Sequence, residues 1–206
     1  VSCDGIQFNT HRSLGLVGDN FNSEEIIGRL KGEMAIGHNR YSTAGETILR
    51  NVQPLFAEFG FGGLAIGHNG NMTNSYGLRK QLVERGCIFQ STMDTEIIIH
   101  LIAISLYSTV VDRIIDALKQ IKGAYSLVAM TDDSLIGVRD PMGVRPLVLG
   151  RIDNAHILCS ETCALDIIGA EYIRDIDPGE IVVVSKEGMR SSSRSRVEFL
   201  TLGFLT

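Results

Sequence analysis

The chain has 206 residues, of which 44% are hydrophobic and 21% charged, and its formal net charge is −5. This is ordinary globular composition, and the acidic balance argues against a nucleic-acid partner because no Lys/Arg stripe interleaved with aromatic residues is present. No apolar run approaches the length of a membrane span and no signal peptide is visible, so we expect no membrane partner and a cytoplasmic protein with its four cysteines reduced.

Two strands are predicted in the first third of the chain, at 34–38 and 63–68, because both segments are short and apolar. Each contains the pentapeptide AIGHN, at 35–39 and 65–69. The first copy continues into Arg-Tyr and the second into Gly-Asn. Two copies with unmatched flanks do not make a solenoid repeat, so the repetition belongs to two single strands followed by different polar residues.

Three helices are predicted in the middle of the chain, at 73–86, 91–106 and 109–124. The first has capping residues at 73–75 and ends at Gly86. The second is expected to begin at Ser91 or Thr92 as its capping residue, which places Asp94 in the first turn, where the helix dipole favours acids. Its apolar residues run nearly all round, so we expect this helix to be buried.

The third helix keeps the helical period and is expected to end with Gly123 at its C′ position. Short apolar segments typical of strands follow, at 124–131, 134–140, 146–150, 156–161 and 180–185. Two connections, 131–133 and 140–143, have hairpin length and predict antiparallel pairing. Because the helices cluster instead of alternating with strands, the pattern indicates an α+β fold of antiparallel sheets with helix layers, not a doubly wound sheet.

The segment GHNGN at 67–71 allows two interpretations. Asn-Gly between apolar runs is the strongest short hairpin signal. A capped helix follows, however, and leaves no return strand. A strand that ends in Asn69 and Gly70 and then enters a helix instead presents a side-chain amide beside a backbone N–H, which are the two donors that an oxyanion hole needs.

Arg40 in GHNRYSTAG is either an exposed strand-end cation or a group that grips a carboxylate with two parallel hydrogen bonds, with Thr43 in the loop beside it. His38 and His68 occupy matching positions and lack a third ligand at metal spacing, so we interpret them as satisfied structural histidines and expect no metal here. Asp94 is most simply a helix acid. If it faces a pocket it can bind an ammonium, and with Arg40 it would make a receptor for an α-amino acid.

At this point the chain resembles a known family. The segments GHNRYSTAG, HNGNMTN, STMDTE, GAYSLVAM, RDPMGVRPLVLG and SETCALDIIGAEYIRDIDPGE are similar to the glutaminase domain of amidophosphoribosyltransferases, class II glutamine amidotransferases that open purine synthesis. The related family that makes glucosamine 6-phosphate shares the GH-x-R-x-x-T and HNG patterns, but would carry Trp after the arginine and lack RDPMGVRPL. Tyr41 and residues 139–147 therefore favour the purine family.

The resemblance implies the four-layer αββα sandwich of N-terminal-nucleophile hydrolases, with the two AIGHN runs as strands of one sheet. Its motifs imply a glutamine site. Arg40 would hold the carboxylate of L-glutamine, and Asp94 its α-ammonium. Asn69 and Gly70 would form the oxyanion hole. Tyr41 and Thr43 would lie in a loop that closes over the substrate.

The chain also departs from the family pattern. The family nucleophile is a cysteine at residue 1 of the mature enzyme, whose thiol attacks the carboxamide while its own α-amine acts as base. Residue 1 here is Val1, and Cys3 stands in SCDGIQF, which resembles a later strand turn. We therefore expect about 30–40 N-terminal residues to be missing and the fragment to be inactive.

The domain is expected to span residues 1–188, and 189–206 to be a divergent or ragged tail. We expect the phosphoribosyltransferase domain of the family to lie outside the given sequence. The resemblance places phosphoribosyl diphosphate and Mg²⁺ in that absent domain, and an iron–sulfur (4Fe–4S) cluster in the full-length protein of some members. No cofactor is expected in this fragment, and the parent is expected to form a homo-oligomer.

Two alternatives stay open. One is another class II amidotransferase of the glucosamine 6-phosphate synthase type. The other is a non-catalytic module that keeps the glutamine pocket without a nucleophile. The sequence encoded upstream of Val1 separates them, because an in-frame CGI would restore the enzyme interpretation, whereas a true start at Val1 would support the binding module.

Overall fold

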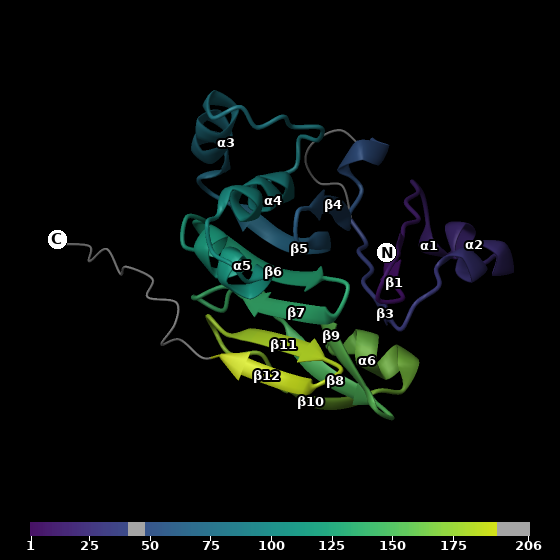
Figure 1. Ribbon diagram of the computed structural model, residues 1–206. Helices are drawn as coiled ribbons and strands as arrows, with labels where there is room; N and C mark the ends of the chain where they lie inside the picture. Colours follow the sequence, from purple (N-terminus) through teal and green to yellow (C-terminus); the bar gives the residue numbers. More distant parts are fainter. Residues whose placement is uncertain (41–47, 193–206) are drawn as a thin grey trace.

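The computed structural model describes residues 1–40 and 48–192 (Figure 1). Its helices are α1 (Val17–Asn20), α2 (Glu24–Arg29), the 3-10 helix η1 (Leu49–Asn51), α3 (Ser75–Glu84), α4 (Thr95–Ile104), α5 (Val110–Leu118) and α6 (Cys163–Ile168). Its strands are β1 (Ser2–Cys3), β2 (Phe8–Asn9), β3 (Met34–Ala35), β4 (Leu55–Phe59), β5 (Gly62–Met72), β6 (Gly123–Met130), β7 (Ser134–Arg139), β8 (Val148–Ile152), β9 (Ala155–Cys159), β10 (Glu171–Asp175), β11 (Ile181–Ser185) and β12 (Gly188–Ser192).

A six-stranded antiparallel sheet lies at the centre of the described part of the chain, with the order β12-β11-β7-β6-β5-β4. The middle of β5 is buried from Leu64 to His68, on both faces of the strand. A strand buried on both faces shows a continuous apolar run instead of alternation, because other layers cover it on each side. The sequence LAIG is such a run.

Helices α4 and α5 cover one face of this sheet (Figure 1). In α4 the residues Ile97, Ile98, Leu101 and Ile102 are all at most 2% exposed. The helix therefore has apolar residues nearly all round, as predicted, because it lies between the sheet and its neighbours. Helix α5 buries one face only, through residues such as Ile114.

Two smaller sheets cover the other face. The sheet β10-β8-β9 packs Leu147, Leu149 and Ile176 against Val182 of the central sheet. The sheet β2-β1-β3 packs against Ala65 and Met130. Helix α6 covers the far side of β8, so closely that a Cβ on Gly150 would lie 2.5 Å from Leu165 Cδ2. The layers are thus helix, sheet, sheet and helix.

Two predicted helix boundaries are wrong. Helix α4 begins after Asp94, not at Ser91 or Thr92, because residues 90–93 form a separate segment held by side chains. Gly123 does not close α5, which ends at Leu118; Gly123 begins β6 with φ 142°. A Cβ there would lie 2.2 Å from the Asn71 carbonyl oxygen, so the glycine permits the close approach of β5.

Two strand predictions are also wrong. Turn 131–133 does join an antiparallel pair, β6 and β7, but 140–143 does not form a hairpin, since β7 and β8 belong to different sheets. The fully buried Asp140 accepts hydrogen bonds from the backbone of Met142, Val144 and Arg145, which turns the chain out of the central sheet. The predicted strand 34–38 is limited to β3, so the first AIGHN run belongs to the N-terminal sheet only through Ala35, whereas the second lies wholly within β5 of the central sheet.

Candidate active site

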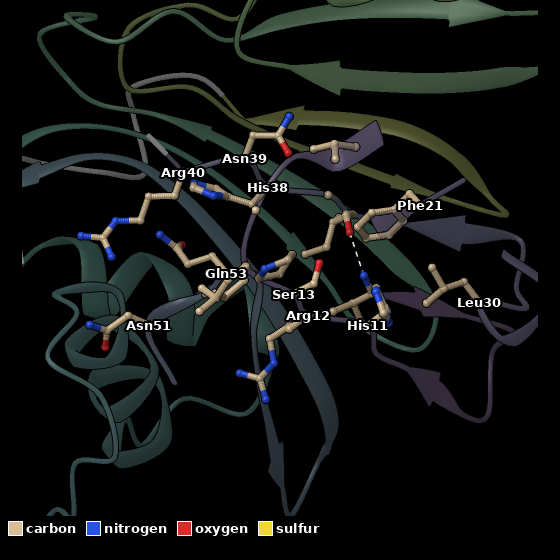
Figure 2. Close-up of a pocket in the computed structure, with 18 of the residues that line it drawn as sticks. His11, Arg12, Ser13, Phe21, Leu30, His38, Asn39, Arg40, Asn51 and Gln53 are labelled. Atoms are coloured by element: carbon tan, nitrogen blue, oxygen red, sulfur yellow. Dashed lines mark hydrogen bonds between the residues drawn. The ribbon is translucent and has the colours of Figure 1, made fainter. Parts of the chain in front are cut away.

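A cavity of about 580 Å³ lies beside the extended segment that follows β3 (Figure 2). Arg40, His38 and Asn39 line it from that segment, and Asn51 and Gln53 line it from η1 and the approach to β4. Among the described lining residues the charged side chains are Arg12 and Arg40, and none is acidic. The described part of the cavity wall therefore carries positive side chains and no negative ones, which is compatible with a carboxylate ligand.

The two AIGHN runs meet at their histidines although they lie in different sheets. His38 Nε2 lies 3.1 Å from the backbone oxygen of His68. Gln53 Oε1 accepts from the His68 N–H at 2.8 Å, and Gln53 Nε2 donates to the His68 oxygen at 3.3 Å. Gln53 precedes β4, and its side chain binds the His68 backbone in the way that the next residue of a neighbouring strand would. It thereby holds β5 immediately before Asn69.

Burial leaves part of each imidazole unsatisfied. His38 Nδ1 and His68 Nε2 are buried without a hydrogen-bond partner, so the prediction of fully satisfied histidines was only half right. Burial, together with the electrostatic influence of His68 and Arg40, lowers the pKa of His38, although its contact with the His68 oxygen opposes the shift. Within the described residues no group of three or more His, Cys, Asp or Glu could hold a metal ion.

Asn69 and Gly70 lie inside β5, opposite Ser126 and Tyr125 of β6. The strand continues to Met72 and then enters α3, so the hairpin interpretation of GHNGN is wrong. A Cβ on Gly70 would lie 2.2 Å from the Ala124 carbonyl oxygen. The glycine is therefore required by the close packing of β5 on β6, whatever else its N–H does.

Asp94 stands at the N-cap of α4, but its side chain makes no capping hydrogen bond. Its Oδ2 instead accepts from the Met72 N–H at 3.2 Å, and its Oδ1 lies 3.4 Å from His68 Nδ1. Burial alone would raise the pKa of Asp94, but the contacts with His68 and the Met72 N–H outweigh it and hold that pKa below its usual range. Asp94 is therefore an ionised, half-buried carboxylate that contacts His68 and Met72 of β5 as well as the Thr95 N–H at the start of α4.

The structure thus brings Asp94 to both flanks of Asn69–Gly70, since it contacts His68 on one side and Met72 on the other. Arg40 lies on the cavity wall, and Asn69, Gly70 and Asp94 are not among the residues lining that cavity. The two parts are joined by the contact between His38 and His68. Tyr41 and Thr43 lie outside the described residues.

A protein-family model matches more than half of the chain. Residues 38–166 match the model of a glutamine amidotransferase domain. The chain belongs to the glutamine amidotransferase family. The matched segment begins at His38 and contains Arg40, Asn69, Gly70 and Asp94, so it includes every described residue that the sequence assigned to the site.

Relatives of this amidotransferase domain carry a more specific name. It is 55% identical over 183 residues to an amidophosphoribosyltransferase of Rhizobium etli, covering 89% of this chain and 37% of that protein. It is 51% identical over 183 residues to chloroplastic amidophosphoribosyltransferase 1 of Arabidopsis thaliana, covering 88% of this chain and 32% of the relative. The chain therefore spans about a third of the length of these relatives.

Solved structures show the same fold. Glutamine phosphoribosylpyrophosphate amidotransferase from Bacillus subtilis, complexed with ADP and GMP, superposes with a TM-score of 0.87 at 41% identity, covering 93% of this chain and 41% of that one. The fold is accordingly the α+β, antiparallel-sheet fold of N-terminal-nucleophile hydrolases, as the resemblance implied.

The cysteines of this amidotransferase domain are unpaired among the described residues. Cys3 is 0% exposed in β1, and its Sγ accepts the Gly5 N–H at 3.4 Å. A buried thiol on an apolar strand is a packing residue, so the geometry agrees with the expectation that Cys3 is not a nucleophile. No helix in the described residues is long and apolar enough to cross a membrane.

Proposed function

We propose that this chain is the glutamine-hydrolysing part of an amidophosphoribosyltransferase. The parent would use glutamine, water and phosphoribosyl diphosphate to form 5-phosphoribosylamine at the start of purine synthesis. The names of the matched relatives and the fold support this over the glucosamine 6-phosphate synthase type.

In this proposal the substrate L-glutamine is held by both ends of its amino-acid head group. Arg40 grips the α-carboxylate with two parallel hydrogen bonds, and Asp94 binds the α-ammonium. Asn69 and the Gly70 N–H then face the side-chain carboxamide and stabilise the charge that develops on its oxygen. Tyr41 and Thr43, which lie outside the described residues, are assigned to glutamine binding as well.

The observation that carries the proposal is the position of the Asp94 carboxylate. It would be an ordinary helix acid if its side chain capped α4, but it turns instead to the Met72 N–H and to His68. The Asp94 carboxylate is held ionised beside Asn69–Gly70. If the side-chain amide of glutamine lay at these oxyanion donors, its α-ammonium would bind at Asp94. The cationic cavity that contains Arg40 supplies the complementary charge.

Hydrolysis also needs a nucleophile. The family chemistry uses a thiolate that attacks the carboxamide carbon, releases ammonia and leaves a thioester for water to cleave. Since Cys3 is buried, we propose that the nucleophile is an N-terminal cysteine outside these residues and that the chain as given binds glutamine without hydrolysing it. Appearance of glutamate that is lost in Cys3→Ala would refute this assignment.

The remaining parts of the proposal concern the parent protein. Mg²⁺, phosphoribosyl diphosphate and any iron–sulfur cluster would belong to the transferase part, and no residue of this chain is assigned to them. We further propose a cytoplasmic, homo-oligomeric parent.

Calorimetric titration of L-glutamine into this chain tests the function. We expect Arg40→Lys to weaken binding nearly as much as Arg40→Ala, because an ammonium cannot reproduce the two-pronged grip of a guanidinium. Arg151→Lys is the matched control, since Arg151 forms an exposed ion pair with Glu171 within the sheet β10-β8-β9. Binding that survives Arg40→Ala unchanged would refute the carboxylate site.

A further inference from the structure

The segment 90–93, immediately before Asp94, has no helix or strand, yet side chains bind most of its polar backbone groups. The N–H groups of Gln90 and Ser91 are bound by Glu96, and that of Thr92 by Asn51. The carbonyls of Ser91 and Met93 are bound by Arg79. Side chains of α3, α4 and η1, and not a regular backbone pattern of its own, therefore determine the shape of this segment.

Glu96 makes the most contacts with this segment. Its Oε1 accepts from the Gln90 N–H at 2.7 Å, and its Oε2 accepts from the Ser91 N–H at 2.8 Å and from Ser91 Oγ at 2.7 Å. The residue is only 8% exposed. A buried carboxylate is costly unless it is hydrogen-bonded, and here three donors satisfy it. Glu96 therefore ties the first turn of α4 back to the segment that leads into it.

Arg79 approaches the same segment from α3. Its Nη2 donates to the carbonyls of Ser91 at 3.1 Å and Met93 at 3.0 Å, and its guanidinium lies 4.0 Å from the centre of the Phe89 ring. The cation–π contact with Phe89 stabilises the guanidinium in this position, from which Nη2 reaches both carbonyls.

Asn51 connects the segment to the cavity. Its Nδ2 donates to Thr92 Oγ1 at 2.9 Å and its Oδ1 accepts from the Thr92 N–H at 3.1 Å, while the residue also lines the cavity that contains Arg40 (Figure 2). Segment 90–93 is thus fixed relative to both ends of the proposed head-group site.

We propose that Glu96, assisted by Arg79, is a positioning residue that holds segment 90–93 so that the Asp94 carboxylate faces Met72 and His68, and that it thereby sets the preference for ligands with an α-ammonium group. This inference rests on the proposed function, because it assigns the reason for glutamine selectivity to residues that do not touch the ligand. Helix α4 has its own buried apolar residues and does not require a buried charge in its first turn.

The test is Glu96→Gln, with L-glutamine and its des-amino analogue, 4-carbamoylbutanoate, titrated into the full chain. The amide side chain that replaces Glu96 has one acceptor oxygen instead of two. Its NH₂ group would lie against backbone N–H donors, so segment 90–93 loosens. We expect affinity for L-glutamine to fall about tenfold or more and affinity for the analogue to change less than about twofold. Amide hydrogen exchange at Ser91 and Thr92 should accelerate in the same variant.

Glu180→Gln is the matched control. Glu180 is also buried, at 3% exposure, and accepts from Arg174, Ser191 and the Asp177 N–H, but it lies immediately before β11, which β7 and β6 separate from β5. It should lower stability without changing the ratio of the two affinities. The double variant Glu96→Gln/Asp94→Asn should lose no more selectivity than Asp94→Asn alone, since both act on one interaction.

Equal loss for the two ligands in Glu96→Gln, or no loss for either, would overturn the positioning role. If Glu96→Gln fails to fold, Arg79→Met gives the same comparison, because it removes the nitrogen that donates to both carbonyls. If the unaltered chain binds no glutamine, the proposed function has failed. Unchanged exchange at Ser91 in Glu96→Gln would then separately overturn the claim that Glu96 holds the segment.

Discussion

Replacing Asp94 by Asn removes one charge from a carboxylate with few other contacts, which makes it the sharpest test of the site. Its Oδ2 accepts the Met72 N–H at 3.2 Å, its Oδ1 lies 3.4 Å from His68 Nδ1, and the Thr95 N–H also interacts with the carboxylate. An asparagine can keep the first contact, but cannot offer an anionic oxygen to an ammonium. A hydrogen bond to a charged group contributes about 1.5–3 kcal/mol. We therefore expect glutamine affinity to fall about tenfold to 150-fold.

Three ligands separate the explanations. L-glutamine and its α-amide both retain the α-ammonium and should lose affinity in Asp94→Asn, whereas the des-amino analogue should not. The free energy of unfolding should change by less than about 1 kcal/mol, because the Asp94 side chain does not cap α4. If the variant binds all three ligands equally less well, Asp94 acts through the fold and the ammonium-binding role is wrong.

The remaining predictions concern stability. Gly70→Ala should lower the free energy of unfolding by about 1–3 kcal/mol, because the added Cβ pushes β5 away from β6. Gly77→Ala, where a Cβ meets nothing within 4 Å, should raise it by about 0.5–1 kcal/mol. Urea unfolding measures both variants, and equal effects would contradict the packing account. Arg174→Met removes the cation that is paired with the buried Glu180 carboxylate and should lower the free energy of unfolding by about 3 kcal/mol. Arg151→Met, which breaks an exposed pair, should lower it by less than about 1 kcal/mol. Burial opposes ionisation of Glu180, but its hydrogen bonds lower its pKa from 4.5 to about 2, so its stabilisation is complete above pH 4.5 and is lost as the pH falls toward 2. Unfolding curves at pH 5 and 3 should therefore differ less in Glu180→Gln than in the unaltered chain.

The sequence alone determined the elements whose signals are local. The apolar period of 91–106 predicts a buried helix, and α4 is one, because that pattern depends only on neighbours three or four residues apart. The clustering of helices likewise predicted antiparallel sheets instead of a doubly wound sheet. For the site, the sequence predicted which residue types would matter, through the polar ends of the two AIGHN runs and the acid before α4.

Only the tertiary structure decided which groups meet. The copies of AIGHN have the same local pattern, yet they lie in different sheets and contact each other through His38 and the His68 oxygen. Glu96 had only the signal of an acid in a first turn, and its three donors became visible when segment 90–93 was folded back onto it. The physical reason is that a periodic pattern records which face of an element is apolar, whereas a side-chain hydrogen bond depends on where distant backbone groups are left without a partner of their own.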